Sequence, residues 1–329
     1  MNTPSTPPPM NDEFAPTAIK PDRPPEGQDT IKGAALLLVA ICIGVFNWTI
    51  IKHLGQEMPS VEIAWFRALF GLIVIIPFVL RTGPSILRTK RPGLHVVRGA
   101  NSSMILALAY FALTHLPIAL VTSISFSRPL FLLVLAAVFL HEKIHSHRAI
   151  ATAVGFIGVL VIVRPGGDFE PAMLASVGSA MLMAVNIVIL KILVRDDPTE
   201  TMIFSVTMFQ TIFLAVPAFI FWQTPTWEQI GWLVAIGVSG TLMQSFMVRA
   251  YRAAEASALA PFDYTRLIFA SLVGFFIFGE IVDNYTLVGA AILIGATFYI
   301  AQRERKIAQA KGPEKPGGQQ RDGAIDSPE

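Results

Sequence analysis

Two arginines lie where a membrane-spanning segment would ordinarily carry only apolar side chains. Arg128 lies in the apolar run 117–142 and Arg266 in the run 256–280, and each run ends in a glutamate 14 positions after its arginine. A guanidinium group binds a carboxylate through two parallel hydrogen bonds, and an ionised side chain at the bilayer centre costs at least about 2.5 kcal/mol. The duplicated pattern therefore predicts one anion-binding solute site between two copies of the same element.

The neighbours of the two arginines are polar. Asp263 precedes Arg266 by three positions, a spacing that puts both side chains on one face of a helix, and Tyr264 lies between them. Serines precede Arg128 and Pro129 follows it, so the helix is expected to loosen one turn earlier. Two interpretations stay open, in which the arginines either bind a solute or make structural contacts to Asp263 and to backbone carbonyls.

Other polar side chains in the apolar runs extend the candidate site. Arg67 either pairs with Glu62 or faces a central cavity. Polar residues on the neighbouring segments either line a path for the solute or bind helices to one another. The full set of candidate solute-binding residues is Arg128, Arg266, Asp263, Arg67, Tyr264, Tyr110, Asn101 and Gln244.

One motif suggests different chemistry. His141, Glu142 and His145 match H-E-x-x-H, the zinc-protease pattern, which needs a continuous helix and a third ligand. The copy around Glu280 keeps the glutamate and loses both histidines. A membrane-embedded zinc hydrolase is therefore the alternative hypothesis, and we expect no bound metal, no cofactor and no enzymatic activity.

The elements that position these residues are apolar helices. The chain is 53% hydrophobic and only 15% charged, with a mean hydropathy of +0.58, whereas soluble domains carry about 25% charged residues. A spanning helix needs about 20 apolar residues. The pattern predicts an all-α polytopic membrane protein with ten transmembrane helices, at 31–52, 60–80, 93–113, 117–140, 147–164, 171–193, 200–222, 228–248, 256–278 and 284–302.

Basic residues predict the orientation of these helices. Connections and tails on one side carry 20 Lys and Arg, including five counted between 81 and 98, and the other side carries only Lys52 and Arg164. The side rich in Lys and Arg is the cytoplasmic one, so both tails are expected in the cytoplasm of a bacterial inner-membrane protein. Because each half has five helices, an odd number, the second half is inverted relative to the first.

The chain thus divides into four parts. We expect a Pro-rich disordered cytoplasmic tail at 1–30 without a signal peptide, a first five-helix repeat at 31–165, a second at 171–302 and a disordered cytoplasmic tail at 303–329. Glycines of the fifth and tenth helices are expected to allow close helix contact. The expected partners are a small-molecule solute and the lipid bilayer, with no nucleic acid; a coupling proton and a homodimer stay open.

The motifs resemble a known family. The stretches from Phe131 to Glu142 and from Gly155 to Gly166, and their copy from Ala260 to Glu280, resemble the EamA type of the drug/metabolite transporter superfamily. The stretch from Val61 to Arg67 and the pair Arg98-Gly99 are similar to the branch that holds bacterial S-adenosylmethionine uptake carriers. The resemblance implies ten helices in two inverted repeats and secondary transport of a small organic metabolite, such as S-adenosylmethionine, an amino acid or a riboflavin-like solute.

The charge distribution makes a testable prediction. Green fluorescent protein fused to the C-terminus is expected to be fluorescent, and alkaline phosphatase fused there is expected to be inactive, because the phosphatase requires export. Fluorescence and phosphatase activity of the two fusions in intact cells are the measurement. An active phosphatase fusion together with a dark fluorescent fusion would contradict the orientation.

Overall fold

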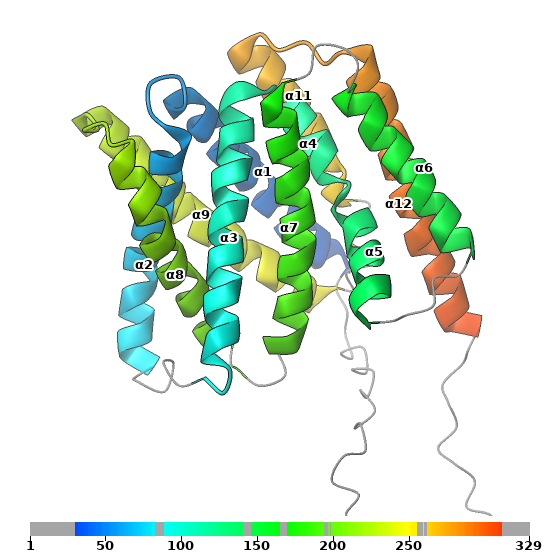
Figure 1. Cartoon of the computed structure of the whole chain (residues 1–329), viewed down its shortest axis with the longest axis horizontal. Helices are drawn as coiled ribbons and strands as arrows, with labels where there is room; N and C mark the ends of the chain where they lie inside the picture. Colours follow the sequence, from blue (N-terminus) through cyan, green and yellow to red (C-terminus); the bar gives the residue numbers. More distant parts are fainter. Residues whose placement is uncertain are drawn as a thin grey trace, which may run out of the picture.

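The computed structural model is a bundle of helices, labelled as in Figure 1. It describes residues 30–82, 89–140, 146–164, 170–193, 197, 199–254, 259 and 262–310. The helices are α1 (Thr30–Leu54), α2 (Ser60–Thr82), α3 (Pro92–His115), α4 (Ile118–Ser125), α5 (Arg128–Leu140), α6 (Ser146–Val163), α7 (Pro171–Leu193), α8 (Thr199–Ile220), α9 (Trp227–Ala253), α11 (Thr265–Phe278) and α12 (Asn284–Ala310).

The helices match the predicted spans in place and character. Within the described residues, seven segments are long and apolar enough to cross a membrane, and three shorter apolar helices occupy the remaining predicted positions. Many large apolar side chains of these helices are exposed, as expected for a surface that faces lipid tails rather than water. The chain is thus an all-α, multi-pass membrane protein.

The fourth predicted span is not one continuous helix. Helix α4 ends at Ser125, a turn covers Phe126 and Ser127, and α5 begins at Arg128. Pro129 explains the break, because it has no amide hydrogen for the carbonyl of Ser125 and its ring would clash with that carbonyl. At the turn, the carbonyl of Ile124 accepts both the Ser127 amide at 3.0 Å and the Ser127 hydroxyl at 2.6 Å.

The ninth predicted span is interrupted at the equivalent place. Phe262 and Asp263 are helical, Tyr264 forms a turn and α11 begins at Thr265. The Thr265 hydroxyl donates to the carbonyl of Phe262 at 2.7 Å. Ser127 and Thr265 each precede an arginine and each bond the carbonyl three residues earlier, so the repeat extends to the hydrogen bonds of the break.

The packing of the helices follows an inverted repeat. If α1, α2, α3 and α6 correspond to α7, α8, α9 and α12, every main contact has its counterpart. Helix α1 packs on α9 as α7 packs on α3, and α2 packs on α9 as α8 packs on α3. Helix α2 packs on its own counterpart α8, and α6 packs on its counterpart α12. The two halves are therefore interleaved, and the fold has two inverted five-helix repeats.

The two ends of the bundle are named by the predicted orientation. The outer end carries the C-terminal ends of α1, α3 and α6 and the connection 279–283. The inner end carries the N-terminal ends of α3 and α6 and the C-terminal end of α7. In Figure 1 the outer end is at the top and α12 ends at the bottom, the inner end.

Two expectations near the inner end are corrected. Arg98 was counted with the basic connection after α2, but it lies inside α3 and is buried. Helix α12 continues to Ala310, so residues 303–310 are helical and not part of a disordered tail. Their sequence, RERKIAQA, consists almost entirely of strong helix formers. The tail residues 1–29 and 311–329 lie outside the described residues.

Helices α6 and α12 lie side by side and cross at two glycines (Figure 1). A Cβ atom added to Gly158 would lie 2.9 Å from the carbonyl oxygen of Gly289, and one added to Gly289 would lie 2.7 Å from that of Gly158. Gly155 similarly packs against Leu130 of α5. Gly295 has open space at its Cβ position, so the expected close contact is absent there.

Substitution at this crossing is therefore expected to be costly. Gly158→Val should destabilise the protein by about 1–3 kcal/mol, the range measured for overpacked cores, because neither backbone can give way without moving a helix. The measurement is thermal unfolding in detergent or nanodiscs. Gly295→Val is the matched control, because a Cβ at Gly295 meets nothing within 4 Å, and the packing assignment fails if both variants unfold at the same temperature.

Candidate functional site

The two helix breaks touch each other. The ring of Phe126, two residues before Arg128, meets the ring of Tyr264, two residues before Arg266, edge to face with centroids 5.3 Å apart. The hydroxyls of Tyr264 and Thr297 of α12 are hydrogen-bonded at 2.8 Å. The structure thus brings the starts of the two half-helices, α5 and α11, to one region of the bundle.

Arg266 and Asp263 form the ion pair that their spacing suggested. The guanidinium Nη2 of Arg266 donates to the Asp263 Oδ1 at 2.8 Å, across the turn at Tyr264. The two side chains keep 18% and 31% of their surface exposed, so the pair is not sealed in the core. The guanidinium also lies 5.9 Å from the ring centroid of Trp48 on α1, within reach of a cation–π attraction.

Arg128 and Arg67 come from other elements of the bundle. Arg128 is the first residue of α5, which packs against α7, and it is half-buried. Arg67 lies beside Gly240 of α9, where its Nε would be 3.4 Å from an added Cβ. It is also close enough to Tyr110 of α3 to act electrostatically on that phenol.

The alternative in which Arg67 pairs with Glu62 is not observed. The two residues are five positions apart, about 140° around a helix, so their side chains point in different directions. Glu62 is fully buried at the outer end and accepts from the backbone amide of Gln223 at 3.1 Å. Within the described part of the chain, its other carboxylate oxygen has no hydrogen-bond partner. Arg67 faces the junction of α2, α3 and α9 instead.

The remaining candidates are spread over the bundle. The Asn101 side chain donates to the carbonyl of Leu182 at 3.0 Å, which binds α3 to α7 as polar residues often do between membrane helices. Tyr110 is buried among apolar residues of the core. Gln244 is exposed on α9. Among the described residues, none of these three is joined to Arg266 by a hydrogen bond, an ion pair or a ring contact.

Sequence reasoning missed Asn47, which is buried in α1. Its side-chain amide donates to the carbonyl of Ile236 at 2.9 Å and to the hydroxyl of Ser239 at 2.8 Å. Both acceptors are in α9, in the other half of the chain. Asn47 thus holds its neighbour Trp48 near Arg266, although its only sequence signal is a lone amide in an apolar run.

A second missed group is a buried cluster at the inner end. The imidazole of His95 on α3 is 2.8 Å from Asp197 Oδ2 and 2.6 Å from the Ser205 hydroxyl on α8. The Thr89 hydroxyl also donates to Asp197, at 2.7 Å. Ser, His and Asp in contact resemble a hydrolase triad, but His95, Asp197 and Ser205 are all buried. The cluster ties α3 to the start of α8.

The ionised form of the Asp197 carboxylate is stabilised by its hydrogen bonds. Burial by itself would raise the pKa of the Asp197 carboxyl, but the bonds from His95, from Thr89 and from the backbone amide of Lys90 hold that pKa below its ordinary value. Nearby, the buried guanidinium of Arg98 donates to the carbonyl of Met202 at 3.0 Å. The inner end is thus joined by polar contacts between the two halves.

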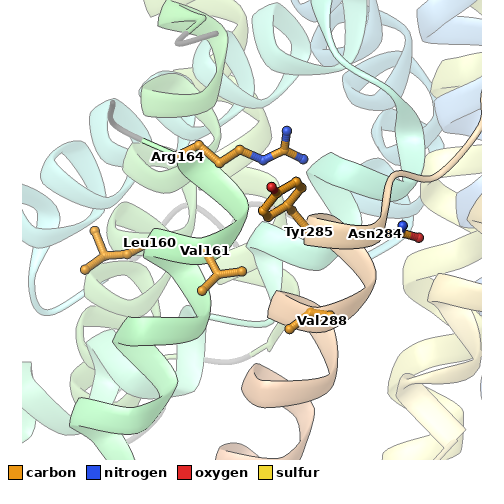
Figure 2. A pocket seen from close by; sticks show the side chains of 6 residues that line it. All are labelled: Leu160, Val161, Arg164, Asn284, Tyr285 and Val288. Atoms are coloured by element: carbon orange, nitrogen blue, oxygen red, sulfur yellow. The ribbon is translucent and has the colours of Figure 1, made fainter. Parts of the chain in front are cut away.

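A cavity of about 620 Å³ opens between α6 and α12 near the outer end. Figure 2 shows the Arg164 guanidinium over the ring of Tyr285, and the two are 3.9 Å apart. Arg164 also pairs with Asp283. No residue that lines this cavity belongs to the predicted solute site. The motif His141-Glu142-x-x-His145 lies outside the described residues.

Comparison with known proteins identifies the family. The model of the EamA-like transporter family matches the chain twice, over residues 31–164 and 170–302. The chain is 34% identical over 286 residues to the S-adenosylmethionine uptake transporter of Rickettsia felis, covering 85% of this chain and 96% of the relative.

More distant relatives carry different solutes. A riboflavin transporter of Brucella anthropi is 31% identical over 75% of this chain and 89% of its own length. A pseudopaline exporter of Pseudomonas aeruginosa is 27% identical over 84% of this chain and 99% of its own length. One crystal structure superposes with a TM-score of 0.54 at 18% identity, over 85% of this chain and 99% of the other, and so supports the fold alone.

The double family match, the inverted packing of the two halves and the names of these relatives agree on one class of protein, which is a transporter and not an enzyme. The resemblance noted in the sequence is thereby confirmed. The chain belongs to the EamA-like transporter family, whose members named here move small molecules across membranes.

Proposed function

We propose that this transporter moves a small organic solute bearing a carboxylate, either anionic or zwitterionic, across the bacterial inner membrane by alternating access. The observation that carries the proposal is the meeting of the two helix breaks at Phe126 and Tyr264, each two residues before an arginine. A solute held there would contact both repeats at once. Rocking of one repeat against the other would then expose it to each side in turn.

The electrostatics of the breaks favour an anion. Arg128 is the first residue of α5 and Arg266 the second of α11. The N-terminal end of a helix carries a partial positive charge, which adds to that of the guanidinium. The candidate solute-binding residues include three basic side chains, Arg67, Arg128 and Arg266, and one acid, Asp263. The surplus of positive charge supports a solute with at least one carboxylate.

The Arg266–Asp263 pair further supports an amino-acid-like group. A carboxylate of the solute would take hydrogen bonds from Arg266, and the solute's ammonium would take the place of Arg266 beside Asp263. S-adenosylmethionine, the solute named for the relatives at about 34% identity, carries such a group beside a sulfonium cation, so its carboxylate and ammonium are the part that Arg266 and Asp263 would bind. Asp263 is also the acid best placed to relay a coupling proton. The relatives include both uptake and export proteins, so their names leave the direction of transport undecided.

The role of the two arginines is tested with lysine variants, which keep the positive charge and lose the planar guanidinium group. Arg128→Lys and Arg266→Lys should each weaken solute binding about ten- to hundredfold, the value of one charge-assisted hydrogen bond. The measurement is binding and uptake of labelled S-adenosylmethionine in proteoliposomes, with a thermal-shift screen of metabolites to replace this probe if it does not bind. Arg249→Lys, at an exposed arginine of α9, is the matched control.

A double variant separates folding from transport. Arg266→Ala leaves Asp263 without its partner, so this variant should be destabilised as well as inactive. Asp263→Asn with Arg266→Gln removes both charges and should restore stability without restoring transport. If the two lysine variants fold normally and carry the solute at wild-type rate and affinity, the arginines are structural and the proposal is wrong.

A further inference from the structure

The short connection 279–283 holds two acids that face the basic residues of the outer end. Lys52 and Arg164 were the two basic residues predicted on the outer side, and the structure pairs them with Glu280 and Asp283. Both basic residues belong to the first repeat and both acids to the second. The outer end is therefore bridged by ion pairs that cross between the repeats.

Glu280 makes a second contact that also reaches the first repeat, whereas the other contacts of the Asp283 carboxylate, from the amide and hydroxyl of Thr286, stay within the second repeat. One carboxylate oxygen lies 2.5 Å from the Lys52 ammonium, and the other accepts from the backbone amide of Ile118 at 3.0 Å. The Lys52 ammonium in turn donates to the carbonyl of Leu116 at 2.6 Å. The Lys52 and Glu280 side chains are each only 12% exposed, so water screens this group of contacts weakly.

The backbone at the end of α11 orients the Glu280 side chain toward Lys52 and the Ile118 amide. Gly279 has a φ of +66°, the left-handed conformation that glycine adopts without strain, and it ends α11. The amide of Glu280 then bonds back to the carbonyl of Gly274 at 2.9 Å. A Cβ at Gly274 would lie 2.7 Å from the Glu280 carboxylate. Both glycines are thus needed for the side chain to fold back along its own helix.

Glu280 accepts a hydrogen bond from the backbone amide of Ile118, which is the first residue of helix α4. The residue before it, Pro117, makes no side-chain cap, so the cap of this helix comes from the other repeat. A carboxylate at a helix N-terminus is favoured by both the unpaired amides and the helix dipole. At its other end, α4 leads into the break at Phe126, whose ring meets Tyr264.

We infer that Glu280 is a positioning residue for transport. Its carboxylate caps α4 while the outer end is closed, and so fixes the half-helix that leads to the break before Arg128. Opening of the outer end separates the repeats, removes the cap and frees α4 to move together with the break. This inference rests on the proposed function, but its test needs no solute.

The test measures how often α4 becomes accessible. Cys42, the one cysteine of the chain, is first changed to Ser. Val121, which is buried in α4 near the outer end, is then changed to Cys, and the reaction of this cysteine with a maleimide is followed in nanodiscs. Glu280→Ala should accelerate labelling about tenfold or more, the equivalent of one hydrogen bond to a charged group. Glu280→Gln keeps an acceptor for the Ile118 amide and should restore most of the protection.

The charge swap Lys52→Glu with Glu280→Lys separates the cap from the ion pair. It restores opposite charges, but an ammonium at position 280 cannot accept from the Ile118 amide and is repelled by the helix dipole, so labelling should stay fast. Glu57→Ala is the control, because Glu57 is an exposed outer acid that accepts from Gln229 and does not contact α4; it should label like the parent.

The outcomes decide the inference independently of the arginine variants. Protection in Glu280→Ala equal to that of the parent, or full protection in the charge swap, would overturn the capping role. Labelling of Glu280→Gln as fast as that of Glu280→Ala would overturn it too, because the ion pair alone would then close the outer end. Thermal unfolding of each variant, measured in the same nanodiscs, shows that faster labelling does not come from global unfolding.

Discussion

Backbone polar groups inside a bilayer have no water to bind, and this constraint governs the centre of the transporter. A break in a spanning helix is tolerated only where protein satisfies the freed groups. Here the hydroxyls of Ser127 and Thr265 bond carbonyls beside the breaks, and the two breaks pack on each other through Phe126 and Tyr264. The breaks are therefore protected from lipid by their mutual contact, and a solute bound between them would lie in the same protein-lined region.

The inverted repeat gives the two helix breaks a role in the proposed alternating access. Each helix of one half packs chiefly on helices of the other half, so contacts at either end of the bundle cross between repeats. At the outer end the crossing contacts are ion pairs from Lys52 and Arg164, with a helix cap from Glu280. At the inner end they are the buried hydrogen bonds of His95 and Asp197. The alternating access proposed above would require these two sets of contacts to break in turn.

The two acids Glu62 and Asp197 show how closely the ends mirror each other. Glu62 lies in the first turn of α2, and Asp197 lies just before α8. Each accepts a hydrogen bond from a backbone amide in the connection after the second helix of the other repeat, from Gln223 and Lys90 respectively. Their remaining partners differ among the described residues, since Asp197 has His95 and Thr89 while one oxygen of Glu62 has none. The repeat thus conserves a position and allows its chemistry to diverge.

The sequence by itself determined the class of protein, the places of the apolar helices, the duplication and the arginine within each duplicated run, because hydropathy, charge and spacing are local properties of the chain. The structure added the helix break that puts each arginine at the start of a half-helix. It also suggested the Arg266–Asp263 pair, since three residues span less than one helical turn. The tertiary structure alone decided that Arg67 turns away from Glu62, that Arg98 is buried in α3 and that Asn47 binds α9. It also gave Glu280 a partner 162 positions away. Such contacts depend on which helices pack together, and that choice is made by the whole bundle rather than by any one segment.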